Sequence, residues 1–147
     1  MDSAKELQEI FYSEIPITQH MGLQVKKLTA QEIQVCAPIH PNMNHKSTAF
    51  GGSLYSVAVL TGWGLLHHIL RHETPEAHIV IFESTIQFQI PVRQDFCASC
   101  HIHDPQQLHP FLHIFRKKGR AKITLHVQIA VPEGIAVSFK GTYVAHV

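Results

Sequence analysis

The chain has 147 residues, the size of one ordinary domain, and 45% of them are hydrophobic. Charged residues make up 16%, and the formal net charge is +1 at pH 7. This balance argues against a general nucleic-acid-binding protein, which needs a strong basic excess, and against a disordered chain. We therefore expect a single domain over residues 1–147.

The termini and the cysteines bear on the expected compartment. Residues 1–6 lack the basic stretch and apolar run of a signal peptide. Three cysteines, an odd number, do not suggest a disulfide framework. We therefore expect no disulfide framework and a cytoplasmic, reducing location.

The first third of the chain predicts a helix followed by two strands. Residues 2–14 place their apolar side chains on one helical face, and Pro16 ends that helix. Residues 23–27 and 32–37 are strand-like, because apolar residues alternate in the second segment. A loop rich in proline, asparagine and histidine follows over residues 38–48.

A long helix is predicted from about Gly52 to Arg71. Residues 47–70 contain no aspartate, glutamate, lysine or arginine, which is long enough for a membrane span. Four glycines and two histidines dilute its hydropathy, and amphipathic strands flank it on both sides. We therefore expect a buried core helix and no membrane partner.

The remaining segments predict an antiparallel sheet. Residues 78–92 alternate as in a half-buried strand, and residues 95–103 are a further candidate strand. Residues 105–118 have helical or turn spacing, and 121–129 with 135–143 predict a hairpin. The face of the 78–92 strand expected to be apolar comprises Val80, Phe82, Ile86, Phe88 and Ile90. One apolar helix wrapped by a curved antiparallel β-sheet is an α+β fold.

Three segments resemble the hotdog-fold thioesterases. Residues 42–54 (Asn-Met-Asn-His-Lys-Ser-Thr-Ala-Phe-Gly-Gly-Ser-Leu) resemble the entry to their central helix, where an asparagine precedes His-Gly-Gly. Residues 86–92 resemble their long central strand, and residues 118–122 a later strand entry. The sequence Thr-Gly-Trp-Gly at 61–64 is typical of the thioesterase-like domain found alone or C-terminal to GNAT-type acetyltransferases. The resemblance implies a stand-alone hotdog domain, a long central helix wrapped by a curved antiparallel sheet.

The resemblance also implies an acyl-transfer site at the start of the long helix. Unpaired N–H groups of Gly51 and Gly52 would lie at the positive end of the helix dipole, where an oxyanion or an acyl-CoA can bind. Asn44 occupies the place of an asparagine near the attacking water in these enzymes. The alternatives are a glycine pair that merely permits a tight turn and an asparagine that forms one.

The sequence departs from the family pattern at two positions. Phe50 replaces the histidine of His-Gly-Gly, and Val59 replaces a helix carboxylate that many relatives carry. Thioester hydrolysis needs a base or a nucleophile. Glu83 in the long strand and His45 in the loop are the candidate substitutes, although each is also compatible with a surface role.

A basic segment is the candidate site for the nucleotide end of coenzyme A. Residues 116–122 carry five positive charges, and the resemblance points to Lys118, Gly119 and Arg120. A solvated basic turn is the alternative.

Two other motifs are set aside. Cys97-Ala98-Ser99-Cys100-His101 matches a haem-attachment pattern, but a strand there sends Cys97 and Cys100 to opposite faces. His68 and His72 are one helical turn apart without an evident third zinc ligand, so we expect no metal.

The resemblance therefore implies hydrolysis of an acyl thioester on coenzyme A or acyl carrier protein, with no cofactor beyond the coenzyme A of the substrate. It also implies a homodimer or homotetramer in which the strands at 78–92 pair edge to edge. Two alternatives remain: a non-catalytic acyl-CoA-binding or regulatory module, and a dehydratase-like hotdog enzyme.

Overall fold

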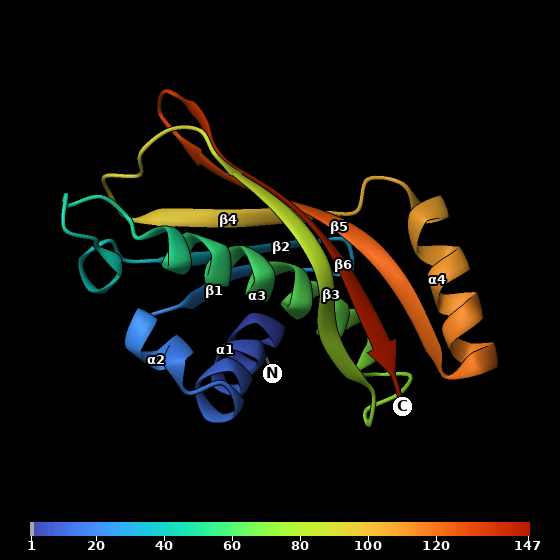
Figure 1. Cartoon of the computed structure of the whole chain (residues 1–147). Coiled ribbons are helices and arrows are strands. Elements are labelled where there is room, and N and C mark those ends of the chain that lie inside the picture. The colour runs from blue at the N-terminus through green and yellow to red at the C-terminus, as the bar shows by residue number, and fades with distance from the viewer. Residues whose placement is uncertain (1) are drawn as a thin grey trace.

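The structure, a computed structural model, describes residues 2–147 as an α+β arrangement of helices and one six-stranded sheet (Figure 1). Every strand pairs antiparallel with its neighbours, in the order β1-β2-β4-β5-β6-β3. The elements are α1 (Ser3–Glu14), α2 (Ile17–Met21), β1 (Gln24–Leu28), β2 (Glu32–Ala37), a 3₁₀ turn (His40–Asn42), α3 (Gly51–Leu70), β3 (His78–Phe88), β4 (Phe96–His101), α4 (Pro105–Lys118), β5 (Arg120–Val131) and β6 (Gly134–His146).

The helix α3 is the centre of the fold, as predicted. It lies against one face of the curved sheet, α1 and α2 lie beyond it, and α4 packs on β5, away from α1 and α2 (Figure 1). By length and composition α3 could span a membrane, but 56% of its most apolar window is buried within the fold. A long helix held by a curved antiparallel sheet is the hotdog arrangement that the resemblance implied.

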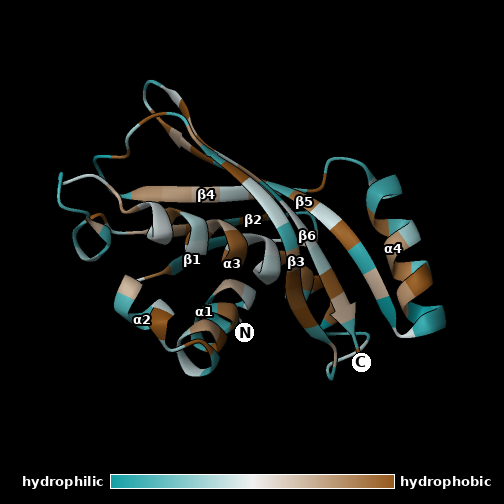
Figure 2. Cartoon of the chain, in the orientation of Figure 1, coloured by the Kyte–Doolittle hydropathy of each residue, from teal (hydrophilic) through white to brown (hydrophobic). Residues whose placement is uncertain are grey.

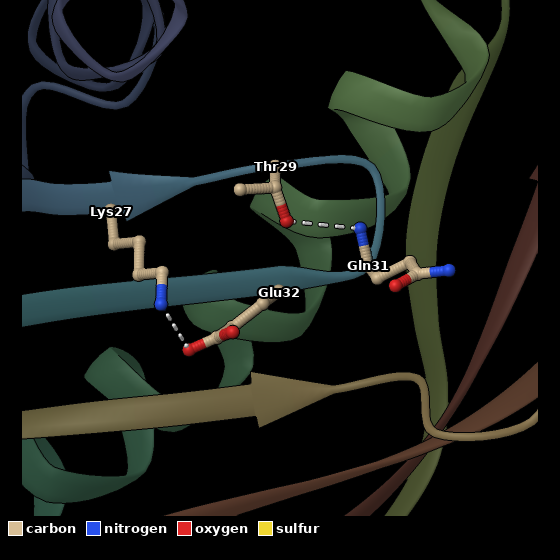
Figure 3. A network of polar contacts seen from close by, with 4 residues as sticks. All are labelled: Lys27, Thr29, Gln31 and Glu32. Atoms are coloured by element: carbon tan, nitrogen blue, oxygen red, sulfur yellow. Dashed lines mark hydrogen bonds and ion pairs between the residues drawn. The ribbon is translucent and has the colours of Figure 1, made fainter.

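The first helices and strands follow the predicted pattern. Asp2 caps α1 by accepting a hydrogen bond from the Ala4 N–H, and the helix buries Leu7 and Phe11. The tight β1–β2 hairpin is closed by a 3.0 Å ion pair between Lys27 and Glu32 (Figure 3). The short helix α2 was not predicted, because five residues are too few to show a helical period.

The motif at residues 61–64 proves to be a packing motif. A side chain on Gly62 would meet the Tyr143 ring, and one on Gly64 would meet Leu7 and Ile33. The indole N–H of Trp63 donates to the Ile79 carbonyl at 2.9 Å, which ties α3 to β3. The two glycines therefore let the helix approach the sheet and α1 closely.

One predicted strand face is wrong. A β-bulge between Ile81 and Glu83 shifts the register of β3 against β6. Before the bulge, Val80 points away from α3, and Phe82 lies on the same outer face, where the Lys122 ammonium sits 4.0 Å from its ring centroid. Both side chains are about half exposed. The expected alternation holds only beyond the bulge, where Ile86 and Phe88 face the helix side.

The cysteines also differ from expectation, because one disulfide bond is present where none was predicted. Cys36 of β2 and Cys97 of β4 are register partners and form a disulfide bond. Cys100 lies on the opposite, buried face of β4, and burial raises the pKa of its thiol to about 12. The two faces expected for Cys97 and Cys100 are therefore confirmed.

Candidate active site

A cleft of about 430 Å³ opens at the N-terminus of α3, between this helix end and the segment that follows β3. Its lining is largely apolar and comes from two stretches of chain: Thr48, Ala49, Gly51, Leu54, Phe88, Gln89, Ile90, Pro91 and Val92. Two large apolar side chains at this end of the molecule, Phe50 and Phe88, are more than half exposed. The cleft can therefore hold an apolar group beside a helix terminus.

The first N–H groups of α3 are free to bind a ligand. Phe50 is the N-cap, and its side chain makes no capping hydrogen bond. The first intrahelical bond runs from the Leu54 N–H to the Phe50 carbonyl at 3.0 Å. Within residues 2–147, no acceptor is found for the N–H groups of Gly51, Gly52 and Ser53. Together with the helix dipole, these donors favour a negatively charged oxygen.

The loop before α3 is a small hairpin held by Asn44. Met43 and Ala49 form an isolated β-bridge, and the Asn44 N–H donates to the Thr48 carbonyl at 2.8 Å. The Asn44 side-chain oxygen accepts from the Lys46 N–H at 2.8 Å, and its amide nitrogen donates to the Thr48 hydroxyl at 2.9 Å. Asn44 therefore shapes the loop, and its amide nitrogen has two N–H groups, of which these contacts use one.

The loop is anchored on both sides of the cleft. The Ala49 N–H donates to the Val92 carbonyl at 2.8 Å, and the Phe50 N–H donates to the Asn42 carbonyl at 2.7 Å. Asn42 is buried, and its side chain donates to the Met21 and Pro38 carbonyls. These bonds fix where α3 begins, so the donors at Gly51 and Gly52 are held in place.

The two candidate substitutes for the missing carboxylate lie elsewhere. Glu83 is exposed on the outer face of the sheet, in a shallow pocket with Lys140 and Thr142. His45 is exposed at the tip of the Asn44–Thr48 turn. In one chain, the structure brings Asn44 close to the start of α3 but does not bring Glu83 to the cleft.

The basic segment lies at the opposite end of the sheet. Gly119 caps α4 in the left-handed conformation, with φ 71°, and its N–H donates to the Phe115 carbonyl. Lys118 and Arg120 flank it, and Arg120 is the register partner of His146. Since His146 also pairs with His78 at the start of β3, the segment is one strand length from the cleft, about 33 Å. Arg116 of the same run is engaged by Glu73.

A polar contact that the sequence did not suggest lies between α3 and β3. The Tyr55 and Ser84 hydroxyl oxygens are 2.6 Å apart, and both residues are half-buried. Ser84 has the same parity as Ile86 and Phe88, so the predicted apolar face already included its position, but no local pattern shows that Tyr55 lies opposite it. Within residues 2–147, no three histidine, cysteine, aspartate or glutamate side chains come together as metal ligands.

Comparison with known proteins agrees with this geometry. The family described as "Putative thioesterase (yiiD_Cterm)" matches residues 4–147. A protein of unknown function from Chlorobaculum tepidum is 33% identical, with a TM-score of 0.88, over 97% of this chain and 93% of its own. A thioesterase-like protein from Shewanella oneidensis is 26% identical, with a TM-score of 0.83, over 99% and 98%.

A more distant match supports the fold alone. A thioesterase from Haemophilus influenzae has 15% identity and a TM-score of 0.76, and the match covers 99% of this chain and 91% of that one.

The family match is near-complete, and it agrees with the long α3 against a six-stranded sheet and with the free N–H groups at Gly51. The chain belongs to the YiiD_C thioesterase family.

Proposed function

We propose that the protein hydrolyses an acyl thioester carried on coenzyme A or acyl carrier protein. The observation that carries the proposal is the set of unpaired N–H groups at the start of α3, which opens on an apolar cleft. Attack on a thioester places negative charge on the carbonyl oxygen, and such donors stabilise that charge. The apolar lining suits the acyl chain.

Groups that line the cleft, and others in the loop and helix start beside it, have roles in this proposal. The Gly51 and Gly52 N–H groups bind the thioester oxygen, and the remaining Asn44 amide N–H holds the water. Phe88, Leu54 and the segment after β3 contact the acyl chain. No carboxylate is assigned as base, because Val59 occupies the helix position where many relatives carry one.

A homodimer completes the site. The free edge of β3 carries Val80, Ile81 and Phe82, which are 36–55% exposed, and Figure 2 shows this end of the strand as a continuous apolar band. An unpaired edge of this kind favours pairing with a second strand. Antiparallel pairing of β3 with its copy about the strand centre sets the start of one β3 beside the end of the other.

That pairing also explains the position of the basic segment. Lys118 and Arg120 lie near the start of β3, and the cleft lies near its end. In the dimer, the basic segment of one subunit therefore approaches the cleft of the other, where it can bind the phosphates of coenzyme A. Each site then consists of residues from both subunits.

The test removes one oxyanion donor without disturbing the helix. Gly51 is the first residue of α3, where proline is tolerated, and Phe50 before it has φ −64° and ψ 133°, which proline also accepts. Gly51→Pro should therefore keep the fold and reduce kcat by about 100- to 1000-fold. Thiol release from short-, medium- and long-chain acyl-CoAs and acyl carrier proteins measures this.

Gly51→Ala is the matched control, because it keeps the N–H and places its Cβ 3.8 Å from the Phe88 ring, an ordinary contact. It should keep turnover within a few-fold. Equal losses in the alanine and proline variants would contradict the oxyanion role. Tight acyl-CoA binding without turnover in the wild type would instead indicate an acyl-CoA-binding module, which the absence of a carboxylate from α3 favours.

A further inference from the structure

The helix α3 and the strand β3 run antiparallel along a seam that starts at the cleft. Gly51 faces the Phe88 ring, Tyr55 contacts Ser84, and Trp63 donates to the Ile79 carbonyl. Successive contacts advance along the helix while they move back along the strand. The Tyr55–Ser84 contact is therefore one helical turn from the free N–H of Gly51, about 6 Å along the axis.

Each element breaks its apolar pattern at this one point. On the helix side of β3, Ser84 stands among Ile79, Ile81, Ile86 and Phe88. On the seam face of α3, residues four apart are glycine, tyrosine, valine and tryptophan, so Tyr55 is the one hydroxyl. The two exceptions meet at 2.6 Å. Functional positions typically break the local pattern of their element, and here two such residues contact each other.

Three other polar side chains of α3 donate to backbone carbonyls. Ser56 donates to the Gly52 carbonyl, Thr61 donates to the Val57 carbonyl, and Trp63 donates to the Ile79 carbonyl. His67 lies 16 residues beyond Gly51, about 24 Å along the helix. Val59, on the same face as Tyr55 and one turn further, has no proton to exchange.

The hydroxyls of Tyr55 and Ser84 can make further hydrogen bonds. A tyrosine and a serine together have two O–H donors, and their mutual bond uses one donor and one lone pair. One O–H and several lone pairs remain for a water molecule. Side chains on a helix lean toward its N-terminus, so the Tyr55 ring extends toward Gly51.

We propose that Tyr55 and Ser84 together accept a hydrogen bond from the hydrolytic water that Asn44 holds and relay its proton, in the role that the missing helix carboxylate would have. This rests on the thioesterase function proposed above. The water oxygen bonds to the thioester carbon and the carbon–sulfur bond breaks. The proton released by the water passes through the two hydroxyls to the leaving thiolate. The products are a carboxylic acid and a free thiol, so no further reactant is needed.

The test compares kcat and KM for Tyr55→Phe, Ser84→Ala and the double variant, on the acyl-CoA that the wild type hydrolyses fastest. Tyr55→Phe keeps the ring and its edge contact with Phe139. Each variant should reduce kcat by about 100-fold, typical of a lost proton-transfer group, with KM within about threefold. The double variant should be no slower than either single one, because the two hydroxyls act as a unit.

Two further variants separate this role from a structural one. Ser84→Thr keeps the hydroxyl and should restore most of the turnover that Ser84→Ala loses. Tyr12→Phe removes a hydroxyl that donates to the Leu23 carbonyl, just before β1 at the opposite edge of the sheet from β3, and it should leave kcat unchanged.

If Tyr55→Phe and Ser84→Ala keep kcat within threefold while Gly51→Pro loses turnover, the relay is wrong and the thioesterase function stands. The relay is also overturned if Ser84→Thr is as slow as Ser84→Ala. If the wild type hydrolyses no acyl thioester of the panel, both proposals fail together.

Discussion

Replacing Gly62 with alanine should destabilise the protein, although the same change stabilises most helices. Alanine improves helix propensity by about 1 kcal/mol. At Gly62, however, a Cβ would lie 2.7 Å from Cζ and 2.8 Å from Cε1 of Tyr143, closer than real carbon contacts. Tyr143 is fully buried, and its hydroxyl donates to the Val59 carbonyl at 2.7 Å. The ring cannot move away without losing that bond.

The magnitude follows from these contacts. Overpacking a core costs about 1–3 kcal/mol, and a lost buried hydrogen bond adds about 1 kcal/mol. After the propensity gain is subtracted, Gly62→Ala should lower the free energy of unfolding by about 1–3 kcal/mol. For a chain of this length, that corresponds to a Tm lower by roughly 3–10 °C.

Urea unfolding monitored by Trp63 fluorescence measures the change. In a Tyr143→Phe background the hydroxyl is absent, so Gly62→Ala should cost less than in the wild type, and the difference is the coupling between the two residues. A Gly62→Ala protein more stable than the wild type would refute the reasoning, because a Cβ at Gly62 would then fit beside the Tyr143 ring without displacing it.

Two further predictions concern the edge strand and the end of α3. Glutamate at both Val80 and Phe82 should convert a dimer into a folded monomer, because these side chains are 50% and 55% exposed in the single chain; light scattering measures the mass. Burial, followed by the nearby Arg71 charge, lowers the pKa of His67 and of His68 from 6.5. The two imidazoles therefore bind a proton less readily in the folded state than in the unfolded state. Stability should be fully present above about pH 6.5 and should fall as the pH drops through the lowered values; urea midpoints at pH 7.5 and 5.5 should differ less once both are glutamine.

The sequence predicted elements with a long, regular pattern. α1, β2, α3 and the β5–β6 hairpin lie close to their expected bounds. A long run without charged residues marks α3, and the others repeat their period over several residues. The helix start beside the candidate site was also predictable, since Gly51 and Gly52 open a helix after a polar loop. In these places local pattern and global fold agree.

The rest depends on contacts between distant segments. A single inserted residue in β3 changed which face Val80 and Phe82 occupy, and no alternation rule detects a bulge. The Tyr55–Ser84 contact required the docking of α3 on β3, which no local pattern shows. The pairing of Cys36 with Cys97 required the strand order, which places β2 beside β4.

The disulfide has a topological consequence for the site. Cys36 and Cys97 are 61 residues apart, and the ring of chain that they close contains all of α3 and β3. Both stretches that line the cleft therefore lie within one covalently closed ring of the chain. On the chain-entropy model, closing a ring of this size raises the free energy of the unfolded chain by about 4 kcal/mol, because the chain loses conformational entropy. A protease cut in the turn at residues 71–77 would leave the helix and the strand linked, and the two fragments would separate only after reduction.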